Sequence, residues 1–165
     1  MADDAQFPIN LVTPERILLT GMATEVMLRT GEGDVTFLAG HTPLVGSVKP
    51  GVVRVVRPDG DVVKVAVHGG FTQVELHVAS GTDDDVVAGS RVTVLVGVAE
   101  LAEEIDADRA RVALEAAEAR VGELGSAAKT PAEGEEADPE LVEAEAAVLR
   151  AQVRLEAVDA ATTTT

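Results

Sequence analysis

The chain has 165 residues and a formal net charge of −16 at pH 7, from 29 acidic and 13 basic residues. It contains no cysteine, which excludes a disulfide framework, a thiolate nucleophile and a cysteine-based zinc site. The negative charge argues against nucleic acid and anionic lipid as partners, and the lack of any long apolar run predicts a soluble, unexported protein with no direct membrane insertion.

Residues 7–99 form a series of short segments rich in valine, leucine and threonine, separated by glycine, proline and aspartate. This composition predicts β-strands. Residues 52–56 and 62–67 flank Pro58-Asp59-Gly60, a turn sequence that predicts a hairpin. We therefore expect an aliphatic β-sandwich or barrel. Its further strands are predicted at residues 10–12, 16–19, 25–29, 35–38, 71–76 and 91–96.

Beyond Ala99 the composition changes to alanine, glutamate and arginine, which favour helix. A first helix is predicted over residues 103–124 and a second one opens at Pro139. Apolar residues spaced three or four apart give each helix one narrow stripe. The stripe of the first helix is Leu114, Ala117, Val121 and Leu124, and that of the second is Val142, Ala146, Leu149 and Val153.

Two domains are predicted from this change, a β-sandwich domain over residues 1–99 and an antiparallel two-helix hairpin over residues 100–165. The second domain holds 17 of the 29 acidic residues and includes a long acidic loop at residues 125–138. Narrow stripes and self-repulsion favour a hairpin that is weakly bound and able to exchange one docking partner for another. The threonines of residues 162–165 are expected to form a disordered tail.

Seven short motifs follow one another between residues 12 and 106. They are Val12-Thr13-Pro14-Glu15-Arg16, Gly31-Glu32-Gly33-Asp34-Val35, Gly40-His41-Thr42-Pro43-Leu44, Lys49-Pro50-Gly51, His68-Gly69-Gly70-Phe71, Val92-Thr93-Val94-Leu95 and Ala102-Glu103-Glu104-Ile105-Asp106. In this order they resemble the epsilon subunit family of F-type, proton-translocating ATP synthases. The resemblance implies a β + α architecture, with an N-terminal ten-stranded β-sandwich followed by a C-terminal antiparallel two-helix hairpin.

The resemblance also implies the function. A member of this family is a non-catalytic subunit of the central stalk, which couples proton-driven rotation of the membrane ring to the catalytic head. The sandwich would bind the gamma subunit and the membrane ring, and the helical hairpin would meet the head and inhibit ATP hydrolysis. Such a protein is peripheral, on the cytoplasmic face of the bacterial plasma membrane.

Three positions depart from the family pattern. Ala39 stands where proline usually precedes Gly40-His41. Residues 77–90, which include Asp83-Asp84-Asp85, look like an extra segment before the last strand. The loop at residues 125–138 is longer and more acidic than usual.

Two residues are candidates for contact with the ring or the gamma subunit. By resemblance, the loop that holds Glu32 lies at the end of the sandwich that meets the ring, and His41 orders the loop beside Pro43. The glycines around Glu32 lack the lysine and the following helix of a phosphate-binding loop, so they predict a turn. The histidines show no metal-ligand spacing, and Asp83-Asp84-Asp85 lacks the rest of a calcium loop, so we predict no metal site.

Residues 105–110, Ile-Asp-Ala-Asp-Arg-Ala, match the motif through which some bacterial members of the family bind ATP. Asp106 and Arg109 would then contact the nucleotide, and guanidinium groups suit phosphate oxygens. Arg150 and Arg154 lie four apart on one helical face and could complete the pocket. The alternative is that Asp106 caps the first helix while the arginines pair with nearby glutamates.

A different class of function stays open from the residues alone. The chain could be a stand-alone acidic β-sandwich binding module, or a small enzyme that uses carboxylates for acid–base chemistry. No paired catalytic constellation is visible in the sequence, so we predict no catalytic residue. Apart from a regulatory ATP, no cofactor is predicted.

Overall fold

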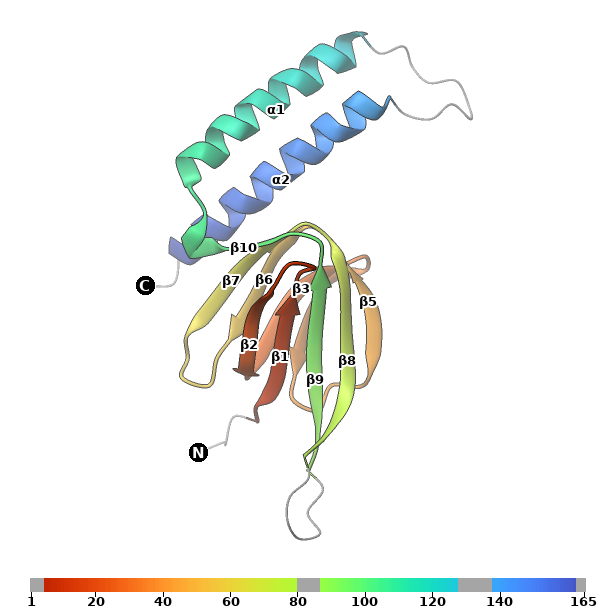
Figure 1. Cartoon of the computed structure of the whole chain (residues 1–165), viewed down its shortest axis with the longest axis vertical. Coiled ribbons are helices and arrows are strands. Elements are labelled where there is room, and N and C mark those ends of the chain that lie inside the picture. Colours follow the sequence, from red (N-terminus) through yellow and green to blue (C-terminus); the bar gives the residue numbers. More distant parts are fainter. Residues whose placement is uncertain (1–4, 80–86, 128–137, 163–165) are drawn as a thin grey trace.

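The computed structural model describes residues 5–79, 87–127 and 138–162. Within these residues a β-sandwich is followed by two long helices (Figure 1). The strands are β1 Phe7–Val12, β2 Ile17–Ala23, β3 Glu25–Thr30, β4 Gly33–Leu38, β5 Leu44–Val48, β6 Gly51–Val56, β7 Val62–Val67, β8 Gly70–Ala79, β9 Val87–Val96 and β10 Ala99–Leu101. The 3-10 turn η1 Ala102–Glu104 leads to the helices α1 Ala107–Ala127 and α2 Pro139–Thr162. The resemblance to a ten-stranded sandwich with two C-terminal helices is confirmed.

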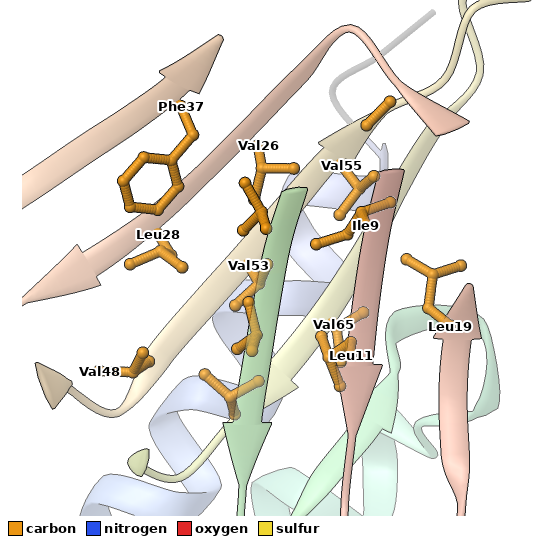
Figure 2. Close-up of a cluster of buried hydrophobic side chains, with 14 of the residues drawn as sticks. Ile9, Leu11, Leu19, Val26, Leu28, Phe37, Val48, Val53, Val55 and Val65 are labelled. Carbon is orange, nitrogen blue, oxygen red and sulfur yellow. The ribbon is translucent and has the colours of Figure 1, made fainter. Parts of the chain in front are cut away.

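The strands form one curved sheet in the order β10-β7-β6-β3-β5-β8-β9-β1-β2, and β4 pairs with β3 beside this path. All neighbours are antiparallel except β1 and β9, which run parallel. The sheet folds into two layers that enclose an aliphatic core (Figures 1 and 2). The fully buried side chains include Phe7, Ile9, Leu11, Val26, Leu28, Phe37, Val53, Val55, Val65, Val74 and Val92.

The predicted hairpin at Pro58-Asp59-Gly60 is confirmed, because β6 and β7 pair antiparallel across it. Gly60 has a φ of 91°, which a glycine adopts without a steric penalty. Two strands were not predicted. β5 contains a glycine and follows a proline, and β10 is only three residues long, so neither carries a clear alternation. Pairing of β10 with β7 extends the sheet to Leu101, two residues beyond the expected domain boundary.

Residues 77–90, which the resemblance predicts to be an extra segment, belong to the β8–β9 hairpin. His77 pairs with Gly89 and Ala79 pairs with Val87. β8 therefore continues beyond residue 76 and β9 begins before residue 91, which were the predicted limits of these two strands. The aspartates of residues 83–85 lie outside the described residues. The described residues of this segment therefore continue the β8–β9 strand pair, which extends away from the helices in Figure 1.

The first helix begins four residues later than predicted. Ile105 is extended, with φ −81° and ψ 123°, and it separates η1 from α1. The Asp106 carboxylate then accepts a hydrogen bond from the backbone N–H of Arg109, 2.9 Å away, and so caps α1. The second helix opens at Pro139 as predicted. The long acidic loop at residues 125–138 lies mostly outside the described residues.

The prediction of the apolar stripe on α1 is confirmed in part, since Ala117 is buried and Leu114, Val121 and Leu124 are half-buried. The stripe predicted for α2 is wrong at two positions, because Val142 and Leu149 are 49% and 43% exposed. A second stripe on α2 packs against α1 instead: Leu141, Ala144, Val148 and Ala151. No described helix is both long and apolar enough to cross a membrane.

Candidate functional site

The end of α2 docks on the outer face of β6 and β7, which we call the docking face. A small apolar cluster forms this contact: Ala66, Ala102, Val153 and Ala157, with Val52 and Ile105 packed against them. The helical hairpin meets the sandwich through this part of α2 and through η1, while the rest of α1 and α2 extends beyond the sandwich (Figure 1). Most of these side chains are alanine and valine, so the buried apolar area is modest.

An ion pair joins α2 to the last strand of the sandwich. The Arg154 guanidinium donates to the Glu100 carboxylate, with Nη2 to Oε1 at 2.5 Å and Nε to both oxygens at 3.0 Å. Hydrogen bonding from Arg154 holds the pKa of Glu100 below its ordinary value, so Glu100 stays ionised. The same bond raises the pKa of Arg154.

A second polar contact lies on the docking face itself. Lys64 of β7 is only 7% exposed, and its Nζ donates to the backbone carbonyl of Ala160 near the end of α2. A third feature is electrostatic. The pKa of Arg29 on β3 is raised, first by its hydrogen bond with Asp34 and further by the charge of Glu156 on α2. Opposite charges therefore face each other across the docked helix.

His68 lies beside the ion pair, directly after β7. Both of its ring nitrogens are buried, and neither has a hydrogen-bond partner among the described residues. Burial lowers the pKa of His68, and the charge of Arg154 lowers it further, against a smaller opposing effect of Glu100. The imidazole is therefore neutral at neutral pH. Buried polar atoms without partners are uncommon in proteins, so this ring marks a place where a ligand atom would be favourable.

The four residues predicted to bind ATP lie around this junction. Arg109 and Arg154 both lower the pKa of Glu100, and Arg150 and Arg154 both lower the pKa of His68. The positive charges of the three arginines therefore act on the same region, around Glu100 and His68. Their individual contacts follow the alternative interpretation. Asp106 caps α1, Arg154 pairs with Glu100, and Arg150 Nη2 lies 2.6 Å from the Glu143 carboxylate.

The two residues predicted to contact the ring or gamma are not brought together. Glu32 precedes β4 and His41 follows it, so a strand roughly 17 Å long separates them, at about 3.3 Å per residue. Glu32 is exposed in the β3–β4 turn, next to the end of β3 that points toward the helices (Figure 1). His41 is at the opposite end, where its Nδ1 lies 2.8 Å from the Thr42 carbonyl and its ring meets Phe37 edge-on.

A feature that the sequence did not predict is an exposed apolar row across the other outer face. Cross-strand pairing aligns Phe71 of β8, Leu95 of β9, Val12 of β1 and Ile17 of β2, and Val45 of β5 lies diagonally beside Phe71. We call these five residues the apolar row. Phe71 is 62% exposed and Ile17 is 65% exposed.

A bulge in β2 completes this row. The pairing of β1 with β2 shifts between Leu11 and Val12, so that Leu18 is the extra residue of β2. Leu18 turns toward the core, and Ile17 is thereby placed opposite Val12 on the outside. A signal was present in the sequence, since Ile17, Leu18 and Leu19 are three consecutive apolar residues that strict alternation cannot all bury.

Comparison with known proteins agrees with this architecture. Residues 6–80 match the family model described as "ATP synthase, Delta/Epsilon chain, beta-sandwich domain". The ATP synthase epsilon chain of Thermobifida fusca is 43% identical over 121 residues, which cover 72% of this chain and 79% of that protein. The epsilon chain of Desulforudis audaxviator is 40% identical over 131 residues, covering 79% and 81%. The chain belongs to the ATP synthase epsilon chain family.

A solved structure supports the fold of this chain. A chain in a structure of the Euglena gracilis mitochondrial ATP synthase, comprising OSCP, F1 and the c-ring, matches with a TM-score of 0.66 and 24% identity. The match covers 96% of this chain and 82% of that one. It therefore includes the helices as well as the sandwich.

Proposed function

We propose that the protein is a non-catalytic coupling and regulatory subunit in the central stalk of an F-type ATP synthase. The observation that carries the proposal is that, within the described residues, only one of the two outer faces of the sandwich is covered by a helix. One face is covered by α2, and the opposite face exposes the apolar row. The sandwich domain, taken as residues 1–99, would hold the rotor parts, and the helical domain, residues 100–165, would act as the regulator.

The apolar row is the proposed contact for the gamma subunit. Large apolar side chains that are contiguous and exposed mark interaction sites, because a monomer gains nothing by leaving them in water. The row crosses five neighbouring strands of one sheet, which is suited to transmitting torque. Glu32 and His41, at opposite ends of β4, would be contacts for the bacterial membrane ring or for gamma, on the cytoplasmic face and without insertion into the membrane.

The helical hairpin is the proposed inhibitor of ATP hydrolysis. Burying a CH₂ group stabilises a contact by about 0.8 kcal/mol, and the docking face offers mainly alanine and valine. A small free-energy difference therefore separates a docked from a released position. In the released position α2 would expose Val153 and Ala157 in line with Val142 and Leu149, giving one continuous apolar stripe for the catalytic head.

Removal of the helical hairpin tests this role. A chain that ends at Glu104 keeps β10 on the edge of β7, whereas one that ends at Ala99 would lose it. We expect the assembled synthase with the shortened chain to hydrolyse ATP faster than with the full chain, and to keep proton pumping coupled. An unchanged hydrolysis rate would contradict the inhibitory role.

Substitution in the apolar row tests the contact with gamma. Phe71→Glu places a charge within the row, between Val45 and Leu95, and we expect it to reduce capture of the gamma subunit at least tenfold in a pull-down. Glu75→Gln, on the same strand and also exposed, is the matched control and should bind normally. If wild-type protein captures no gamma, the alternative of a stand-alone binding module or small enzyme is favoured instead.

A second proposed activity is regulatory ATP binding at the junction of the two domains. The observation that favours it is that both ring nitrogens of His68 lack a hydrogen-bond partner among the described residues, beside the charges of Arg109, Arg150 and Arg154. Phosphate oxygens would compete with Glu100 for Arg154, and the exposed Arg109 is already free to meet them at the start of α1. The nucleotide would then bridge Arg109 of α1 and Arg154 of α2, so contacts to both helices would replace the ion pair with Glu100 and hold the hairpin together.

Nucleotide titration tests this site on the isolated chain. We expect ATP to slow hydrogen exchange in α1 and α2 in a saturable manner, and Arg109→Gln to abolish the effect because one phosphate partner is lost. Arg111→Gln is the control, since Arg111 lies one half-turn away and pairs with Asp108. Exchange that is independent of ATP concentration would refute nucleotide binding.

A further inference from the structure

Lys64 holds an unusual position for a lysine. Among the described residues it is the only charged residue that is buried. Burying an ammonium group is unfavourable unless it is paired and hydrogen-bonded. Lys64 donates to the carbonyl of Ala160, a residue on a different domain and 96 positions along the chain. The burial of this charge therefore depends on α2 being in place.

The acceptor is the negative end of a helix. The last four carbonyl groups of a helix have no partner within it, and the aligned peptide dipoles favour a cation there. α2 carries no basic residue in its own last turn. Lys64 of the sandwich thus supplies the cation that the sequence of α2 lacks.

The neighbours of Lys64 allow this contact. Alternation along β7 places Lys64 and Ala66 on the same outer face, and Ala66 packs in the cluster with Ala157 of α2. Alanine on both sides lets the helix backbone approach the sheet closely enough for a lysine to reach a main-chain carbonyl. A larger residue at either alanine would hold α2 away from Lys64.

We propose that Lys64 is a latch, a positioning residue that selects the docked position of the helical hairpin by capping the C-terminal end of α2. Its ammonium gains this partner only when α2 lies on the docking face, and it returns to water when α2 leaves. The latch acts at one end of the docked segment, and the Arg154–Glu100 pair acts about one and a half turns earlier. The consequence for hydrolysis rests on the proposed inhibitory role, but the latch itself does not.

Hydrogen exchange of the isolated full-length chain tests the latch. Lys64→Met keeps an aliphatic side chain of similar length and removes the ammonium. We expect amides of residues 153–160 to exchange about tenfold faster, the scale of a favourable partly buried cation at a helix end, while β6 and β7 keep their protection. Unchanged exchange in α2, or equal acceleration in β6 and β7, would overturn the proposal.

Two further variants distinguish capping of α2 by Lys64 from a general effect of positive charge on the docking face. Arg54 is the cation directly across from Lys64 in the β6–β7 pair, and Arg54→Met should leave α2 exchange close to that of the wild type. In a chain that ends at Ala157 the acceptor is gone, so Lys64→Met should add no further acceleration. An effect of Arg54→Met as large as that of Lys64→Met, or an additional effect in the shortened chain, would contradict the latch.

Different experimental results would reject the latch and the proposed inhibitory function. In the assembled synthase, Lys64→Met should release the helical hairpin and lower ATP hydrolysis. Faster exchange in α2 of the isolated chain together with unchanged hydrolysis would reject the inhibitory role and support the latch. Unchanged exchange would reject the latch whatever the hydrolysis rate.

Discussion

The docking of α2 on the outer face of β6 and β7 is the contact on which the arrangement of the two domains depends. Ala66 and Val52 place small apolar side chains on that face, and Lys64 lies among them with its charge buried. Without α2 these groups would be exposed to water. The contact buries a small apolar cluster, which suits the two positions proposed for the helical hairpin.

Charged and polar contacts help to define the position of α2, beside the apolar cluster. Glu100 binds Arg154, Lys64 binds the end of the helix, and Glu156 acts on Arg29. These contacts are directional or sign-dependent, whereas a patch of alanines would accept the helix in several registers. In a chain with a net charge of −16, cations on both sides of the contact, Arg154 on α2 and Lys64 and Arg29 on the sandwich, therefore mark where the helix lies.

Much of the fold could be predicted from the sequence, because the alternation in β7 and the turn at Pro58-Asp59-Gly60 are local signals. The change of composition after Ala99 likewise placed the two helices. The stripe on α2 failed because this helix carries two apolar faces. One, through Ala144 and Ala151, meets α1, and the other is shared between the docking face at Val153 and solvent at Leu149.

The functional residues were harder to predict for a related reason. The motif that contains Asp106 and Arg109 is a run of neighbouring residues and could be recognised in the sequence. The burial of Lys64, and the burial of the His68 ring without a hydrogen-bond partner among the described residues, depend on segments far away in the chain. The apolar row has the same origin, since Phe71, Leu95 and Ile17 meet only through the pairing of distant strands. Local sequence patterns predict the strands and helices, whereas the pairing of distant strands determines which of their faces stay exposed.

The most direct test of the account is to fix the helical hairpin in its docked position and measure ATP hydrolysis. The chain has no cysteine, so Glu100→Cys and Arg154→Cys can be joined by a reagent that spans two side chains and is cleaved by reduction. We expect the linked synthase to hydrolyse ATP at the rate of the complex whose chain ends at Glu104, and reduction to restore the slower rate. Equal rates in the linked and reduced forms would contradict the claim that release of the helical hairpin causes inhibition.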